Sequence, residues 1–180
     1  MQNKRVLNRE YTKEEIESKK PRPMKKNIDD YKPSGNLYKN LKTSDGRRIN
    51  YIEPEDSSLP TTKYRLFCFK NDEEIEEPLY MDKRSFYIFG TDQKNVDSIL
   101  MHKTCEGQHA VIQFRHNGDT VLPYIIDLNS KYGTYLNKCI IKPSTYIELR
   151  EGDMLMFGKS QREYILVIEK PIKTTRTHSK

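Results

Sequence analysis

Short apolar and aromatic runs separated by turn residues are the feature that most constrains the fold of this chain. Between residues 63 and 170 such runs recur at intervals of about 8–12 residues, as in all-β domains. Tyr, Phe, Ile, Leu and Val, which favour strands, dominate the runs. Alanine, the best helix former, occurs once in the whole chain, at Ala110. The pattern therefore predicts an all-β fold, either a two-sheet sandwich or a barrel, and argues against a helical bundle.

The expected strands can be placed by their residue ranges. They are 63–70, 78–81, 84–90, 109–115, 120–128, 134–136, 138–141, 144–150, 153–158 and 162–170. Asn117–Gly118, between two of these ranges, is a strong hairpin signal. Pro123 cannot donate a ladder hydrogen bond, so an edge strand or a bulge is expected there. Segments 71–78 and 91–108 are expected to be loops, the second with a short apolar piece at Ile99–Met101.

Charge divides the chain into an acidic body and basic ends. Residues 1–50 carry 14 Lys and Arg against 7 Asp and Glu, residues 51–169 carry 14 against 19, and residues 170–180 add 4 cations and no acids. A nucleic-acid groove across the body is disfavoured, because such a groove needs clustered cations. RNA contact is expected only as a minor role of the basic ends, and no role at a membrane is expected because no apolar run approaches ~20 residues.

The first 50 residues contain too few apolar side chains to offset the entropy of ordering. We therefore expect residues 1–26 to be a disordered basic tail and residues 171–180 to be a second basic tail. The run Lys19–Lys26 fits either a nuclear-import or nucleic-acid patch or a solvated tail. The N-terminus lacks the apolar segment of a signal peptide, which favours an intracellular protein.

The reactive side chains form no recognisable catalytic or metal-binding motif. Cys68, Cys105 and Cys139 are odd in number and widely spaced, so neither a disulfide framework nor a zinc site is expected. Cys68 and Cys139 lie in apolar runs and are expected to be small buried side chains. A catalytic Cys105–His109 pair is the sharper alternative, but no known signature supports it. We expect a protein that is not an enzyme and has no cofactor, metal or small-molecule substrate.

Seven of the aromatic residues in these apolar runs are interpreted as core residues. Few cations flank them, so an RNA-stacking platform is the weaker interpretation. They are Tyr64, Phe67, Phe69, Phe86, Tyr87, Phe89 and Phe114.

Four separated motifs give the chain a more specific resemblance. They are YIFGT (87–91), CEGQHAVIQF (105–114), YIIDLNSKYGTYLN (124–137) and YIELREGDMLMFG (146–158). In order and spacing they resemble the forkhead-associated (FHA) family. The resemblance implies a two-sheet sandwich of about ten or eleven strands, over residues 61–170.

Further segments resemble one branch of that family, the FHA subunits of the pre-mRNA retention and splicing complex. They are KYRLFCFKNDE (63–73), FGKSQREYILV (157–167), YKPSGNL (31–37) and YIEPED (51–56). The resemblance implies a nuclear, non-catalytic adaptor of the spliceosome, whose sandwich docks on other spliceosomal proteins. It also implies that an extension, residues 27–60, holds the RNA-recognition-motif subunit through residues 27–55.

The extension has the composition of a peptide that folds on a partner, with sparse apolar anchors in a polar segment. A linker with a few stray apolar residues is the alternative. The expected partner-binding residues are Tyr31, Pro33, Ser34, Gly35, Leu37 and Tyr38.

FHA domains hold phosphothreonine at one end of the sandwich, through an Arg, a Ser and an Asn. In this chain these three positions hold Thr91, Glu106 and Tyr132. A carboxylate at 106 would repel phosphate. The geometric positions of the family pattern are kept, as Gly90, His109, Gly133 and Thr134.

The resemblance therefore implies a degenerate phosphothreonine pocket. Lys103, Lys131 and Lys94 lie nearby in sequence and could partly replace the lost charge. A phosphothreonine-reading signalling module is accordingly kept as the alternative function.

Overall fold

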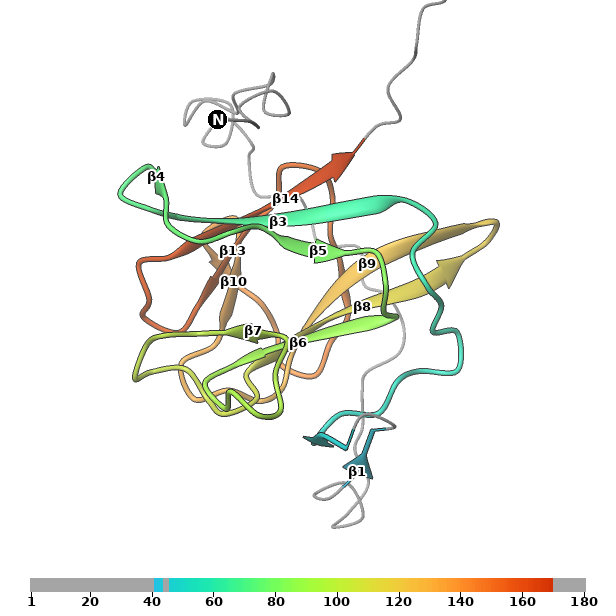
Figure 1. The fold of residues 1–180 in the computed structure, drawn as a ribbon, viewed down its shortest axis with the longest axis horizontal. Helices are drawn as coiled ribbons and strands as arrows, with labels where there is room; N and C mark the ends of the chain where they lie inside the picture. Colours follow the sequence, from blue (N-terminus) through green and yellow to red (C-terminus); the bar gives the residue numbers. More distant parts are fainter. Residues whose placement is uncertain (1–40, 44–45, 170–180) are drawn as a thin grey trace, which may run out of the picture.

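The computed structural model describes residues 41–43 and 46–169, and these form a sandwich of two sheets with a short strand pair outside it (Figure 1). The outside pair is β1 (Leu41–Lys42) and β2 (Arg48–Ile49). The all-β, two-sheet prediction is confirmed. The sandwich has more strands than expected, seven in one sheet and five in the other.

The seven-stranded sheet has the order β11-β10-β13-β14-β3-β4, with β5 also paired to β3. Its strands are β3 (Lys63–Lys70), β4 (Glu73–Glu74), β5 (Leu79–Met81), β10 (Thr134–Leu136), β11 (Cys139–Ile140), β13 (Met154–Phe157) and β14 (Glu163–Glu169).

The five-stranded sheet has the order β12-β9-β8-β6-β7. Its strands are β6 (Phe86–Gly90), β7 (Ser98–Ile99), β8 (Ala110–Asn117), β9 (Thr120–Asp127) and β12 (Ile147–Glu148). The β8–β9 hairpin turns at Gly118, where φ is +62°, as the Asn-Gly signal predicts.

Apart from β1 and β2, which the sequence did not predict, the structure differs from the sequence prediction in three strands. The expected loop 71–78 contains β4, and the expected loop 91–108 contains β7, which runs parallel to β6. β9, the strand with Pro123, lies inside its sheet rather than at an edge, because β12 pairs with it on the side opposite β8. β12 pairs only with residues 124 and 125, so this ladder ends just where the N–H of Pro123 is missing.

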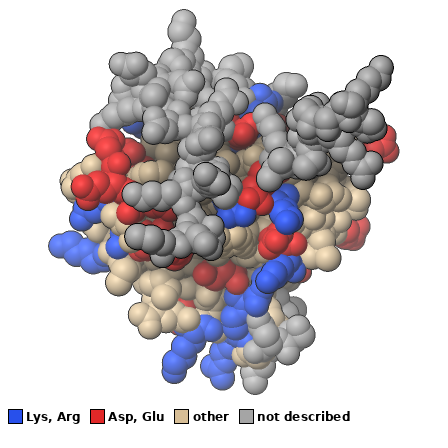
Figure 2. All heavy atoms as spheres, turned by 45° about the horizontal axis from the view of Figure 1, so that its top comes forward, with Lys and Arg blue, Asp and Glu red and all other residues tan. Residues whose placement is uncertain are grey.

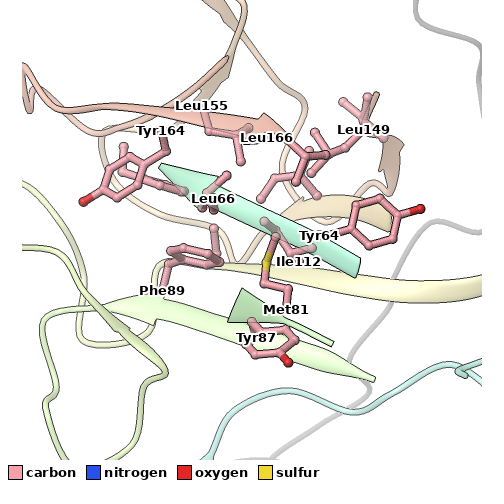
Figure 3. Close-up of a cluster of buried hydrophobic side chains, with 14 of the residues drawn as sticks. Tyr64, Leu66, Met81, Tyr87, Phe89, Ile112, Leu149, Leu155, Tyr164 and Leu166 are labelled. Carbon is pink, nitrogen blue, oxygen red and sulfur yellow. The ribbon is translucent and has the colours of Figure 1, made fainter. Parts of the chain in front are cut away.

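The main core fills the space between the sheets (Figure 3). Aromatic pairs join the layers, with ring centroids 5.2 Å apart for Tyr64–Phe114 and 5.3 Å apart for Phe89–Phe157. The core prediction is wrong for one of the seven aromatic residues, Phe69, which is partly exposed. Phe67 is buried, but both side chains alternate with the core residues of β3, so they lie on the outer face of the seven-stranded sheet, where their rings stack 6.5 Å apart.

A segment before β3, residues 46–58, packs on the outer face of the five-stranded sheet, and we call it the strap. Ile49 and Tyr51 of the strap form a second buried cluster with side chains of that sheet. Tyr51 is 1% exposed, and its hydroxyl donates to Gln113 Oε1 at 2.7 Å and lies 2.8 Å from the hydroxyl of Tyr146. The folded unit therefore begins before residue 61, and this part of the expected extension packs on the domain itself.

An ion pair fastens the C-terminal part of the strap. Arg115 Nε donates to both carboxylate oxygens of Asp56, at 2.9 and 3.1 Å. The same guanidinium lies 4.4 Å from the ring centre of Tyr146. Gln113 Nε2 also donates to Ser57 Oγ at 3.0 Å. Such convergent polar contacts fix one position of the strap on the sheet.

Other sequence predictions have mixed outcomes. Cys68 and Cys105 are buried, but Cys139 is partly exposed because it lies on the edge strand β11. Among the described residues, none belongs to a helix that could cross a membrane. The expected tails 1–26 and 171–180, and the expected anchors between Tyr31 and Tyr38, lie outside the described residues.

Candidate functional site

Three loops meet at one end of the sandwich, and we call this the loop end. The first loop, 91–97, joins β6 to β7; the second, 100–109, follows β7; the third, 128–133, joins β9 to β10. Backbone bonds link the first two loops, from Thr91 N–H to the Glu106 carbonyl (2.9 Å) and from Asp92 N–H to the Gly107 carbonyl (3.1 Å). The structure thus brings together the pocket positions that the sequence predicted.

Two glycines allow the loops to approach so closely. A Cβ added at Gly90 would lie 2.0 Å from the carbonyl oxygen of Gly107, so no other residue fits there without a backbone shift. Gly133 has φ +75°, and its added Cβ would lie 2.7 Å from Ile140 Cδ1. These positions therefore need glycine for geometry, as the family pattern implies.

His109 connects the second and third loops from a completely buried position. Its Nδ1 accepts the Glu106 N–H at 3.1 Å, so the ring proton is on Nε2, which donates to the Gly133 carbonyl at 3.2 Å. Burial lowers the pKa of His109, although the Gly133 carbonyl and the Asp127 and Glu106 carboxylates oppose this shift. His109 is therefore a neutral structural residue.

Asp127 organises the third loop from the end of β9. Its carboxylate accepts hydrogen bonds from Ser130 N–H (2.9 Å), Ser130 Oγ (2.7 Å) and Thr134 Oγ1 (2.7 Å). Both Asp127 and Thr134 are fully buried. Thr134 thus holds the third loop in shape and does not face a ligand.

Glu106 ties all three loops together. Its carbonyl accepts from Thr91 N–H of the first loop, and its own N–H donates to His109. Its carboxylate Oε1 accepts the N–H of Lys131 in the third loop at 3.3 Å. A carboxylate thus already occupies a backbone donor at the position where the family pattern has a Ser.

Tyr132 is partly exposed and is flanked by two cations. The Nζ atoms of Lys131 and Lys159 lie 5.5 and 5.0 Å from its ring centre, within cation–π range. The Lys159 N–H donates to Thr104 Oγ1 at 2.8 Å, which places this lysine beside the second loop and the exposed Lys103. Sequence reasoning missed Lys159; its position directly after the closing Phe157–Gly158 motif was the available signal.

The arrangement offers little for catalysis. Burial, followed by the charge of Glu106, raises the pKa of the Cys105 thiol to about 11, so it is protonated at neutral pH. Neutral His109 uses both ring nitrogens in structural hydrogen bonds, so it is not available as a base for Cys105. In the described part of the chain, no three His, Cys, Asp or Glu side chains gather as a metal site would require.

Comparison with known proteins agrees with this geometry. The family model of the FHA domain matches residues 87–158, which span all three loops. The chain therefore contains an FHA domain, and its two sheets form an FHA sandwich.

Among characterised proteins, the chain is 37% identical to an FHA domain-containing protein, DDL, of Arabidopsis thaliana over 81% of its own length and 49% of that protein. It is 41% identical to Smad nuclear-interacting protein 1 of Mus musculus, over 76% of its own length and 38% of that protein. The chain thus spans about half or less of these two relatives.

Among solved structures, the yeast Pml1 splicing factor, described with its integration into the RES complex, superposes with a TM-score of 0.62. That match has 27% identity and covers 67% of this chain and 98% of the yeast chain. The chain is also 36% identical to a probable serine/threonine-protein kinase of Dictyostelium discoideum, but it matches only 11% of that protein. The chain thus resembles a splicing factor over nearly the whole of that factor's solved structure.

Proposed function

We propose that this protein is a non-catalytic nuclear adaptor in a splicing complex of the RES type. The similarity to yeast Pml1, which covers 98% of the yeast chain, supports this class of function. The similarity to the kinase supports no catalytic role, because it covers 11% of that protein. Nuclear location is inferred from the same splicing relative and from a relative named as nuclear-interacting.

The observation that carries the proposal is the chemistry of the loop end. Thr91, Glu106 and Tyr132 stand where a phosphothreonine-reading FHA domain needs a cation and two neutral hydrogen-bonding groups. The Glu106 carboxylate also accepts the Lys131 N–H, so one backbone donor is already used. The sandwich therefore acts as a docking body for other splicing proteins rather than as a reader of phosphothreonine.

The extension supplies the specific attachment in this proposal. Residues 27–40, with anchors from Tyr31 to Tyr38, bind the RNA-recognition-motif subunit of the complex, and coupled folding concentrates the binding energy in those anchors. Residues 46–55 of the strap fall within the predicted binding region 27–55, but the strap is packed on the sheet through Ile49 and Tyr51. The proposal therefore narrows the binding segment to the residues before β1.

Phosphothreonine reading remains the second candidate function. One observation favours it: Lys131 and Lys159 both lie beside Tyr132, and they could supply the cationic charge that Thr91 does not.

A binding experiment with the full chain tests the proposal. Deletion of residues 27–40 should abolish binding to the RNA-recognition-motif subunit in isothermal titration calorimetry, whereas deletion of residues 2–15 should leave it intact. Titration with a phosphothreonine peptide library should give no phosphate-dependent binding. Retained subunit binding without residues 27–40 would reject the adaptor arrangement, and phosphate-dependent binding would establish the second candidate.

A further inference from the structure

The start of the strap, which includes β2 of the β1–β2 strand pair, is bonded directly to the loop end. Arg47 Nη1 forms an ion pair with Asp97 Oδ1 at 3.0 Å, and Arg48 N–H donates to Asn95 Oδ1 at 2.7 Å, both on the first loop. Gln108 of the second loop donates to the Arg48 carbonyl and accepts from Asn50 N–H, each at 2.8 Å. In Figure 1, β1 accordingly lies beside the five-stranded sheet, below β6.

This attachment fixes the point at which the extension leaves the domain. The last expected anchor, Tyr38, is three residues before Leu41, the first residue of β1. A chain of three residues spans at most about 11 Å when fully extended. A protein that holds Tyr38 must therefore lie against the part of the domain that surrounds β1 and β2.

The surface around this exit point is basic, although the body as a whole is acidic. On β2 and the residue before it, on the first loop and on residues 82–85 before β6, five cations face three carboxylates. Four of these cations are Arg47, Arg48, Arg84 and Lys94. We call these four cations the exit patch. Figure 2 shows Lys and Arg side chains gathered at the lower end of the molecule, the end at which Figure 1 places β1.

The two carboxylates of the first loop are already engaged. Asp97 Oδ1 accepts from both Arg47 and Arg84, and its Oδ2 accepts from Ile88 N–H. Asp92 accepts from the side chain of Asn95 and from Lys94 N–H. Arg48 and Lys94 are exposed and form no ion pair within the described residues, so their charge is available to a partner.

We infer that the exit patch is the second half of the interface with the protein that binds residues 27–40, and that this protein presents an acidic face to it. The inference rests on the proposed function, because that function brings a protein to the exit point. Two available cations are few for an RNA site, which depends on neutralising many phosphates. Two cations suffice for a protein that is already bound to residues 27–40. That segment holds the protein close to the domain, and charge complementarity then fixes how the protein is oriented on it.

Charge reversal in the full chain tests the inference. The double variant Arg48→Glu, Lys94→Glu should bind the RNA-recognition-motif subunit about tenfold more weakly, because attraction becomes repulsion at the patch. The matched control, Lys63→Glu, Lys70→Glu, reverses two exposed cations at the ends of β3 and should stay within about twofold of the parent. The difference between the two variants should shrink as the salt concentration is raised.

The outcomes separate this inference from the proposed function. If the Arg48, Lys94 variant binds like the control, the exit patch inference is overturned, while loss of binding on deletion of residues 27–40 still supports the adaptor. If that deletion also leaves binding unchanged, the proposed function itself fails. If the charge reversal weakens binding of a labelled single-stranded RNA but not of the subunit, the patch contacts RNA and the inference is overturned.

Discussion

His109 illustrates how a residue that looks catalytic in the sequence is used for structure. It is fully buried, and each ring nitrogen makes a hydrogen bond that only the neutral form with Nε2–H can make together. Burial is the main cause that lowers its pKa from the ordinary value of 6.5. The folded state therefore takes up a proton on this ring at a lower pH than the unfolded chain does.

This difference predicts a pH dependence of stability. Above pH 6.5 the ring is neutral in both states, so its contribution is fully present; as the pH falls below 6.5, the unfolded chain gains a proton that the folded protein resists. The free energy of unfolding should therefore decrease by up to about 1.4 kcal/mol per pH unit below 6.5. Urea unfolding between pH 7.5 and pH 5.5 measures this decrease.

Two variants assign the effect to one ring. His109→Gln should be less stable at all pH values and should lose most of the decrease, because the titrating group is gone. His116→Gln, which removes an exposed ring, should keep the decrease of the parent. An unchanged pH dependence in the His109 variant would show that another group is responsible.

At the scale of elements, the strap is as much a part of the fold as the strands beneath it. Tyr51 fills the second cluster, and its hydroxyl forms a chain with Gln113 and Tyr146. Since the Tyr51 hydroxyl donates to Gln113, the Tyr146 hydroxyl must donate to Tyr51. Removal of this one hydroxyl therefore leaves one acceptor and one donor unsatisfied in a buried place.

We predict a graded loss of stability from substitutions in the strap. Tyr51→Phe should lower the free energy of unfolding by about 1–3 kcal/mol through the unsatisfied groups, and Tyr51→Ala by about 3–5 kcal/mol through the added cavity. The control Leu59→Ala removes a side chain that is 58% exposed and should cost less than about 0.5 kcal/mol. Equal effects of Tyr51→Ala and Leu59→Ala in chemical denaturation would show that the strap does not contribute to the fold.

The strap also shows which elements the sequence can predict. Long runs such as 63–70 and 120–127 carry their own strand signal, because strand-forming residues fill both faces. β4 and β7 have two residues each and exist only through their partners, so no local pattern marks them. Ile49 and Tyr51 were recognisable as isolated apolar anchors, but composition cannot tell whether an anchor packs on its own domain or on another protein.

The loop end likewise has features that the sequence predicts and contacts that it does not. The motif spacing indicated Gly90, Glu106, His109 and Gly133 as neighbours, because the family resemblance carries the order of the loops. It could not reveal that the Glu106 side chain reaches Lys131 N–H, nor that Lys159 lies beside Tyr132, since both contacts join segments far apart in the chain.

At the scale of the whole molecule, the exit patch and the pocket positions of the loop end are neighbouring but chemically separate. The exit patch uses side chains of β2 and the residue before it, of the first loop and of the residues before β6. The pocket positions instead lie where Thr91 N–H bonds the Glu106 carbonyl and where Glu106 Oε1 accepts the N–H of Lys131, next to Tyr132. Gln108 links the strap to the second loop two residues from Glu106, so the two regions share a support without sharing their functional groups. Substitutions at the pocket positions should therefore leave binding at the exit patch unchanged, and substitutions at the exit patch should leave the pocket positions unchanged.

Restoring the family's ligand contacts tests this separation. The triple variant Thr91→Arg, Glu106→Ser, Tyr132→Asn should bind phosphothreonine peptides in a phosphate-dependent way. The buried supports, Gly90, His109 and Gly133, are unchanged, and one charge-assisted bond contributes about 1.5–3 kcal/mol. Binding of the RNA-recognition-motif subunit should stay within about twofold of the parent, because no cation of the exit patch is altered. Fluorescence anisotropy with a phosphothreonine peptide library and its dephosphorylated form measures the first effect, and calorimetry with the subunit measures the second.

The double variant Glu106→Ser, Tyr132→Asn is the control, and without the guanidinium it should bind at least about tenfold more weakly than the triple variant. If the triple variant folds but shows no phosphate dependence, the loops do not keep the family's pocket geometry; if it loses the subunit as well, the two regions are not separate.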